Sequence, residues 1–195
     1  MSIEIREIGI DLLPLYSEIP ESFRVESVFR IKLIDKGLGG FRFIEEKVSP
    51  YVKWDERYED DSGPASWPKR FDIGNWGIFM AFKGFQPVGG VAVAIDIQAG
   101  MTTPFESEGT AILWDLRVHL DERRCGIGSR LFKYAADWAR RKGYRQLKIE
   151  TQNVNVPACR FYAKQGCVLG AIHRYGYAGL PDVAHESVLL WYLEL

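Results

Sequence analysis

The sequence feature that most constrains the fold is a strand pattern that passes through a short glycine-spaced turn into a helical pattern. The strand pattern, AILWDLRV at 111–118, is apolar on much of both faces, which is typical of a strand in the middle of a sheet. From Gly128 to Lys142 apolar residues recur at helical spacing, and Gly143 is suited to cap the end of that helix. We therefore expect a β-α unit at the centre of an α/β protein.

The segment before this unit predicts antiparallel strands. Strand patterns lie at 3–8, 25–35, 41–48, 76–83 and 91–97, with the turns KGLGG and GFQPVGG between the members of the two hairpins. The remaining segments fit a loop or short helix at 11–22, an irregular surface segment at 51–70 and a loop at 99–109.

The segment after the unit continues as strand, helix and two strands. A strand pattern at 146–151 precedes a short helix that Asn155 caps, with Pro157 in its first turn and Gly166 at its end. Strand patterns at 168–177 and 185–195 follow. The whole order, antiparallel β and then β-α-β-α-β-β, predicts an α/β sheet of mixed direction within one domain spanning 1–195.

Length and composition describe an ordinary globular domain and exclude several partners. The 195 residues carry a formal net charge of −1, which gives no electrostatic reason to bind nucleic acid or an anionic membrane. No apolar run reaches the roughly 20 residues of a membrane span, and MSIEIREIGI lacks a signal-peptide pattern, so we expect a cytoplasmic protein. Cys125, Cys159 and Cys167 lack zinc-site spacing, which predicts free thiols and no metal.

The turn at 123–128 has two interpretations. Its glycines at 126 and 128 can serve turn geometry alone, or they can let backbone N–H groups at a helix N-terminus approach a phosphate, with Arg123, Arg124 and Arg130 adding positive charge. A dinucleotide fingerprint fits poorly, because Leu131 stands where its third glycine belongs and the next strand ends without a clear ribose-binding acid. A nucleoside-triphosphate loop also fits poorly, because its lysine is missing.

A second motif favours the phosphate interpretation. The pattern R-x-x-G-x-G from Arg123 to Gly128 resembles the acetyl-CoA pyrophosphate loop of the GNAT superfamily of N-acyltransferases. The family's second motif, N-x-x-A-x-x-x-Y, is matched one helix and one strand later by Asn155, Ala158 and Tyr162. The stretches LKIETQNVNVPACRFYAKQG and ESVLLWYLEL resemble the streptothricin acetyltransferase branch. The resemblance is specific over about 111–195 and thin before residue 75.

This resemblance implies the GNAT acyl-CoA N-acyltransferase fold, a central, mostly antiparallel sheet with a splayed parallel pair, flanked by helices. It makes 111–175 the acetyl-CoA-binding core and 1–75 a divergent, acceptor-side part. The splayed pair is 111–118 with 146–151, and its open backbone groups bind the pantetheine amides. The residues that the resemblance assigns to acetyl-CoA, the co-substrate, are Leu116, Arg117, Val118, Arg123, Arg124, Cys125, Gly126, Ile127, Gly128, Ser129, Asn155, Ala158 and Tyr162.

Acetyl transfer to an amine needs a neutral nucleophile and a proton for the departing thiolate. The resemblance places Tyr162 where the family carries its general acid, and a tyrosine hydroxyl with a pKa of about 10 is suited to that role. The alternative is that Tyr162 is a core aromatic beside Phe161.

Two carboxylates are candidates for the general base, Asp115 on the cofactor strand and Glu150 at the end of the next strand. Either could instead pair only with Arg117 or Lys148. Strand alternation predicts that Asp115 lies on the face opposite Trp114.

These features predict an acetyl-CoA-dependent N-acetyltransferase that acts directly on a primary amine of a small, cationic acceptor. A streptothricin-like or aminoglycoside-like antibiotic, in a resistance role, and a polyamine both fit; a protein N-terminus or lysine stays open. The alternative class is a non-catalytic acyl-CoA-binding module, which would need the loop at 123–128 but neither Tyr162 nor the acids. A homodimer is compatible with the family, but no surface stripe in the sequence argues for one.

Overall fold

The computed structural model describes residues 2–54, 63–95 and 109–195. Its internal contacts divide the chain into two compact units. The first unit comprises Met1–Glu21, Glu56–Ile149 and Leu193–Leu195, and the second comprises Ser22–Asp55 and Glu150–Tyr192. The expectation of one domain over 1–195 stays a prediction.

The first unit is built on a sheet whose strands follow the order β1, β4, β5, β6, β7. Neighbouring strands are antiparallel except β6 and β7, which are parallel. This mixed sheet confirms the predicted fold class, and β6 has the central place predicted for 111–118. The strands are β1 Ile3–Glu7, β4 Gly77–Lys83, β5 Gln86–Ala94, β6 Thr110–Val118 and β7 Gln146–Gln152.

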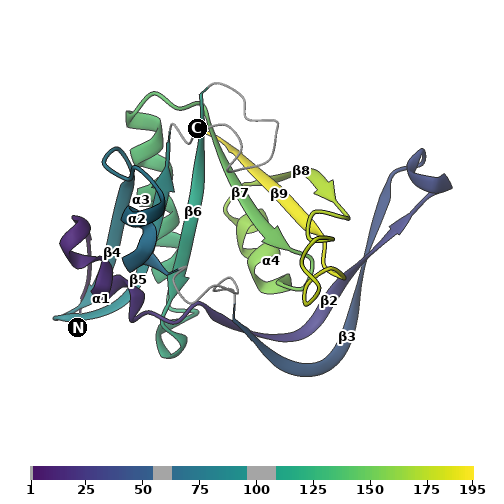
Figure 1. The fold of residues 1–195 in the computed structure, drawn as a ribbon, viewed down its shortest axis with the longest axis horizontal. Coiled ribbons are helices and arrows are strands. Elements are labelled where there is room, and N and C mark those ends of the chain that lie inside the picture. The colour runs from purple at the N-terminus through teal and green to yellow at the C-terminus, as the bar shows by residue number, and fades with distance from the viewer. Residues whose placement is uncertain (1, 55–62, 96–108) are drawn as a thin grey trace. The chain divides into compact units, whose positions relative to one another are not determined.

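Helices cover both faces of this sheet (Figure 1). Helix α3 (Ile127–Arg141) lies on one face, where a Cβ atom at Gly89 would come within 2.9 Å of Leu131. Helix α1 (Leu13–Ser17) lies on the other, where a Cβ atom at Gly90 would come within 2.0 Å of the Tyr16 ring. The expectation that GFQPVGG is a turn is therefore wrong, since both glycines belong to β5 and make room for a helix on each face.

The face that carries α1 holds an aromatic core. The rings of Tyr16, Trp67, Trp76 and Trp114 contact one another in that order, each pair tilted, and the Tyr16 and Trp67 centroids are 5.6 Å apart. Trp67 begins α2 (Trp67–Arg70), a single helical turn inside the segment predicted to be irregular. The loop predicted at 99–109 lies outside the described residues except for Gly109.

A β-bulge in β6 corrects the predicted orientation of Asp115. Val93 of β5 pairs with Leu113, but the preceding residue, Ala92, pairs with Asp115, so Trp114 is an extra residue in the ladder. A bulge resets strand alternation. Trp114 and Asp115 consequently lie on the same face: Trp114 packs on the aromatic core, and Asp115 contacts Tyr16 of that core. The prediction of opposite faces is wrong.

The second unit contains a long two-stranded ribbon, the strands β8 and β9, the end of β7 and helix α4 (Val156–Lys164). The ribbon strands are β2 (Ser22–Leu33) and β3 (Phe41–Trp54), and β9 (Val188–Glu194) follows β7 and precedes β8 (Val168–His173) in the strand order. Strand β3 runs on through 51–54, where a loop was predicted, because these residues pair with β2 as far as Ser22↔Trp54.

Both predicted helix caps are confirmed. Gly143 follows α3 with a φ of +87°, a left-handed conformation that suits glycine. The Asn155 side chain accepts a hydrogen bond from the Ala158 N–H at 3.2 Å and caps α4. Among the described residues, no helix is both long and apolar enough to cross a membrane.

Candidate active site

The turn between β6 and α3 has the backbone conformation that its glycine spacing requires. Arg124 and Gly126 have φ angles of +64° and +83°, so the chain reverses direction twice before the helix begins at Ile127. A Cβ atom at Gly126 would meet nothing within 4 Å. The glycine is therefore needed for the left-handed conformation and also leaves open space directly above the helix entrance.

The start of α3 presents backbone N–H groups to that open space. The N–H of Arg130 donates the first helical bond, to the Gly126 carbonyl at 3.1 Å. The amides of Ile127 and Gly128 precede it and, like those at any helix N-terminus, carry partial positive charge. This arrangement fits the donor set that a pyrophosphate needs.

The three arginines near this turn have different roles. Arg123 Nε donates to the Val118 carbonyl at 2.9 Å, and burial lowers the pKa of its guanidinium, so this side chain fastens the turn to β6. Arg130 donates to the Ile3 carbonyl of β1 at 2.9 Å and is directed toward that strand. Arg124 is exposed beside the turn. The sequence predicted that all three add positive charge at the turn; in the structure Arg123 and Arg130 donate to backbone carbonyls, whereas Arg124 lies exposed beside the turn.

Strand β6 has open backbone groups beyond its parallel pairing. Its register with β7 runs from Thr110↔Gln146 to Leu113↔Ile149, whereas β6 continues to Val118. The N–H of His119 donates to Val88 of β5, so by alternation the backbone of Arg117 faces β5 and those of Leu116 and Val118 face away from it. The predicted splay is present in β6. On the side away from β5 lie both backbone groups of Leu116 and the N–H of Val118, whereas the Val118 carbonyl accepts from Arg123 Nε.

Asp115 lies in a buried hydrogen-bonded network that the sequence did not reveal. It accepts from the Tyr16 hydroxyl at 2.5 Å and from Arg117 Nε at 2.9 Å. Arg117 also donates to Glu21 at 2.9 Å and to the Ile19 carbonyl at 3.1 Å. The alternative that Asp115 pairs with Arg117 is thus confirmed, and Tyr16, 99 residues away in sequence, completes the site.

The electrostatics of this network favour a charged Arg117 and a neutral Tyr16. Burial, and then the charge of Asp115, raise the pKa of Tyr16 well above its usual value. Burial acts to lower the pKa of Arg117, but the carboxylates of Asp115 and Glu21 outweigh it and raise that pKa. Within the described part of the chain, Asp115 Oδ1 is buried without a hydrogen-bond partner.

Glu150, the other candidate base, lies in the second unit in a more open setting. Its side chain is exposed and accepts a hydrogen bond from the Tyr177 hydroxyl at 2.8 Å. Tyr177 lies in the connection between β8 and β9, where the sequence predicted the end of a strand. The partner of Glu150 is therefore a tyrosine hydroxyl, which neither alternative for Glu150 anticipated.

Helix α4 carries the three residues of the second motif. Asn155 is its cap, Ala158 follows in the first turn, and Tyr162 is buried with its ring 5.1 Å from Phe161 in an edge-on arrangement. The ring contact with Phe161 agrees with a packing role for Tyr162, and the position on the helix agrees with the motif.

The cysteines are free, as predicted, with Cys125 exposed and the other two buried. Burial raises the pKa of Cys159 and of Cys167 to about 11, so both stay as thiols at neutral pH. Cys125 lies in the glycine turn.

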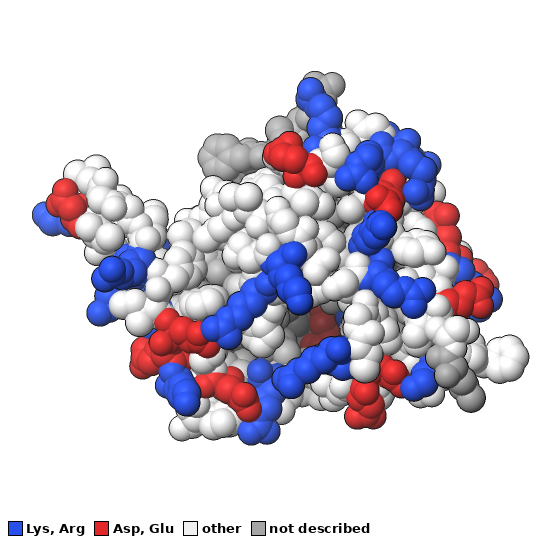
Figure 2. Space-filling view, turned by 180° about the vertical axis from the view of Figure 1, so that it is seen from behind, with Lys and Arg blue, Asp and Glu red and all other residues white. Residues whose placement is uncertain are grey.

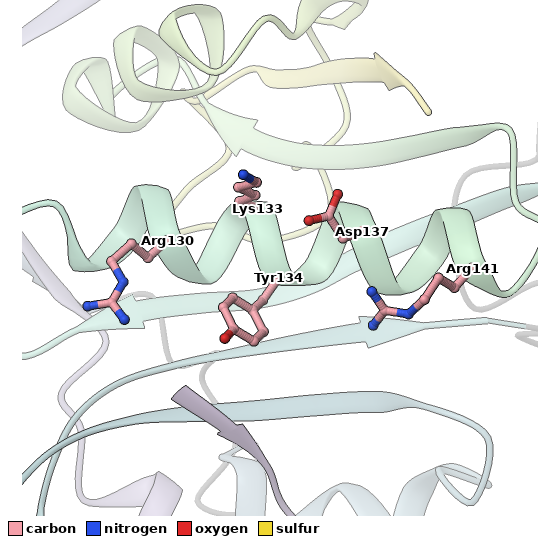
Figure 3. A pocket seen from close by; sticks show the side chains of 5 residues that line it. All are labelled: Arg130, Lys133, Tyr134, Asp137 and Arg141. Carbon is pink, nitrogen blue, oxygen red and sulfur yellow. The ribbon is translucent and has the colours of Figure 1, made fainter. Parts of the chain in front are cut away.

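On the face in Figure 2, basic and acidic side chains are intermixed, in keeping with the net charge of −1. A shallow pocket on the outer side of α3 has Arg130, Tyr134 and Arg141 directed to one side and Lys133 and Asp137 to the other (Figure 3). All five come from one helix, and the two motifs contribute none of them.

Together, the mixed sheet, the glycine turn at a helix N-terminus and the open edge of β6 define an acetyltransferase of the GNAT class. Residues 43–167, more than half of the chain, match the Acetyltransferase (GNAT) family. The chain belongs to this family. It is therefore an N-acetyltransferase, and acetyl-CoA is the co-substrate of this class of enzyme.

Three similar proteins share the name streptothricin acetyltransferase. The chain is 31% identical over 170 residues to a streptothricin acetyltransferase of Escherichia coli, covering 87% of this chain and 84% of the relative. It is 29% identical over 155 residues to streptothricin acetyltransferase A of Bacillus subtilis (strain 168), covering 79% and 80%. A proposed streptothricin acetyltransferase of Bacillus anthracis, solved with acetyl coenzyme A, superposes with a TM-score of 0.76 at 27% identity, covering 100% and 98%.

Proposed function

We propose that this enzyme transfers the acetyl group of acetyl-CoA directly to a primary amine of a small, cationic, streptothricin-like molecule. The observation that carries the proposal is the pair of motifs, R-x-x-G-x-G at 123–128 in the first unit and Asn155, Ala158 and Tyr162 in the second, each on the element the family uses. The streptothricin acetyltransferases among the relatives support the choice of acceptor.

The first unit binds the co-substrate. The amides of Ile127 and Gly128, with Arg124 beside them, bind the pyrophosphate, because a helix N-terminus stabilises an anion. The backbone groups of Leu116 and the N–H of Val118 pair with the pantetheine amides in the manner of an added strand.

The second unit supplies the proton chemistry. Acetyl-CoA provides a thioester, whose carbonyl carbon forms a bond with the amine nitrogen while the bond to sulfur breaks. Tyr162 donates its hydroxyl proton to the departing thiolate. Glu150 takes the proton that the amine nitrogen loses, directly or through water. After the products leave, Glu150 releases its proton to solvent and Tyr162 regains one from solvent.

Glu150 is the better of the two candidate bases. Its carboxylate is exposed and holds one hydroxyl donor, so a cationic amine can approach it. Asp115 is buried, and one of its oxygens already accepts from both Tyr16 and Arg117. An acid that is committed to a buried guanidinium is a poor proton acceptor, because protonating it would leave the buried cation with less compensation. Asp115 instead fixes the strand that holds acetyl-CoA.

Thiol release from acetyl-CoA, measured with Ellman's reagent, tests the proposal. Streptothricin, an aminoglycoside, a polyamine and a peptide with a free N-terminus serve as acceptors. We expect turnover with streptothricin, and we expect Tyr162→Phe to lower kcat by roughly 100-fold with the affinity for acetyl-CoA kept, since general acid catalysis contributes about 10²–10⁴-fold. The matched control is Tyr134→Phe, on the exposed side of α3.

Binding of acetyl-CoA in calorimetry without turnover on any of the four acceptors would instead identify a non-catalytic acyl-CoA-binding module. Turnover confined to the peptide would identify a protein N-acetyltransferase. Equal activity of Tyr162→Phe and the Tyr134→Phe control would remove Tyr162 from the chemistry.

A further inference from the structure

The outer half of the β2–β3 ribbon has two chemically different faces. In its register, Ile31 lies opposite Phe43 and Leu33 lies opposite Phe41. Directly opposed residues of an antiparallel pair point to the same side. These four side chains, with Phe29 further in, form one continuous apolar face, which we call the apolar ribbon face. The Phe29 and Phe43 rings touch edge-on, with centroids 5.6 Å apart.

The other side of the same strands is charged. Arg30 lies opposite Ile44 and Lys32 lies opposite Arg42. Arg30 forms an ion pair with Glu46, one step further in, at 2.8 Å. The ribbon is therefore amphipathic, a pattern expected of strands that are packed against another surface on one side and exposed to solvent on the other.

The apolar ribbon face is not covered within the described residues. Leu33 and Phe41 are 40% and 45% exposed, and Ile31 and Phe43 are partly exposed. In the turn that joins the strands, Leu38 is 90% exposed. Figure 1 shows the outer ribbon extending beyond α4 and β8 of its own unit. A two-stranded ribbon in water is marginally stable by itself, so this segment needs a partner surface.

We propose that the apolar ribbon face packs against the same face of a second copy of this chain, so that the enzyme is a symmetric dimer held by its β2–β3 ribbons. A two-fold interface brings one surface against itself, and it therefore has to be self-complementary. The apolar ribbon face meets this condition because its five side chains are apolar, and the charges on this side of the ribbon, Glu45 and Lys47, lie at its inner end. Glu45 forms an ion pair with Arg160 of the same chain.

The charged side of the ribbon does not meet the condition. Two copies joined there would bring Arg30, Lys32 and Arg42 against their own counterparts, and like charges opposite one another are destabilising. The choice of face thus follows from the distribution of charge on the ribbon.

The size of the apolar ribbon face fits a dimer of modest strength. A large side chain has a surface area of about 150–250 Å². Multiplied by the exposed fractions of these side chains, this gives roughly 500 Å² of solvent-accessible apolar surface on the face and the adjoining turn. Two copies would bury about 1,000 Å² in total, which is the lower limit for a specific protein interface. The dimer is thus expected to dissociate on dilution.

Sedimentation velocity over roughly 1–100 µM chain tests the proposal, because interfaces of this size span weak to tight affinities. At the upper end we expect a particle of twice the 22.3 kDa chain mass. Leu33→Asp places a charge in the apolar ribbon face and should give a 22.3 kDa monomer throughout the range. Ile44→Asp is the matched control: it makes the same change at an aliphatic residue of similar exposure, 36% against 40%, on the opposite side of the ribbon.

The control should remain a dimer. Leu38→Asp is a second variant, at the exposed turn, where a substitution does not disturb packing within the chain. Because it buries a charge at an apolar contact, it should raise the dimer dissociation constant at least about tenfold. A monomeric wild type at 100 µM, or equal behaviour of Leu33→Asp and Ile44→Asp, would overturn the proposal and leave the apolar ribbon face to a different partner. The test does not depend on the acceptor of the enzyme.

Discussion

The role assigned to Asp115 leads to a quantitative prediction for Asp115→Asn. The substitution keeps the shape of the side chain but removes the charge that faces Arg117. Both side chains are nearly inaccessible, 4% and 3% exposed. Loss of one partner of a buried ion pair costs about 3–5 kcal/mol, because the other charge stays buried without compensation.

The expected loss lies at the lower end of that range. Arg117 keeps Glu21, whose side chain is 30% exposed, and the carbonyl of Ile19. We therefore expect Asp115→Asn to lower the free energy of unfolding by about 3 kcal/mol, which for a chain of this length lowers the melting temperature by roughly 6–12 °C. Urea unfolding followed by tryptophan fluorescence, together with thermal melting, measures both quantities.

A surface ion pair supplies the control for this experiment. Asp137 and Arg140 on α3 form an exposed pair at 2.8 Å, with side chains 40% and 52% accessible. Asp137→Asn should change stability by less than about 0.5 kcal/mol. If Asp115→Asn were as stable as this control but had lost turnover, Asp115 would be the general base and the structural role argued above would be wrong.

Two further predictions concern the second unit. Tyr177→Phe removes the hydroxyl that holds Glu150 in place, so we expect kcat to fall by about threefold, as the loss of one positioning hydrogen bond implies. An unchanged kcat, equal to that of exposed Tyr175→Phe, would contradict this. The folded chain holds the Cys159 proton to about pH 11, against 9.0 for an ordinary thiol, so folding stability should fall between pH 9 and 11 by up to about 1.4 kcal/mol per pH unit. Cys167 is raised in the same way and adds a decline of its own, so Cys159→Ala should reduce the slope in pH-dependent urea unfolding without abolishing it, and exposed Cys125→Ser should leave it unchanged. A slope shared by the wild type and both variants would refute the assignment.

Patterns confined to a short stretch of chain predicted most of the element order. The strand pattern at 111–118, the helical spacing that follows it and the caps at Gly143 and Asn155 depend on neighbours within a few residues. Such features are local, so they can be recognised before the chain is folded. The two motifs are also local, and for that reason the family could be inferred from them.

Tertiary structure decided the environment of each candidate base. The bulge at Trp114 depends on how β5 and β6 pair, and it places Asp115 on the same side as Trp114. Tyr16 reaches Asp115 from 99 positions away, and Tyr177 reaches Glu150 from 27 positions away. No local pattern contains this information, because the side chains meet only after the strands and helices have packed.

The apolar ribbon face also depends partly on a local sequence pattern and partly on tertiary structure. In the sequence, VFRIKLI and FRFIEEKV alternate apolar and polar residues, and either set could have faced the interior. Pairing of β2 with β3 brought Ile31, Leu33, Phe41 and Phe43 to one side and left them exposed. Alternation fixes that a strand has two different faces, but only the register with a neighbouring strand and the contacts of the folded chain decide which face remains open.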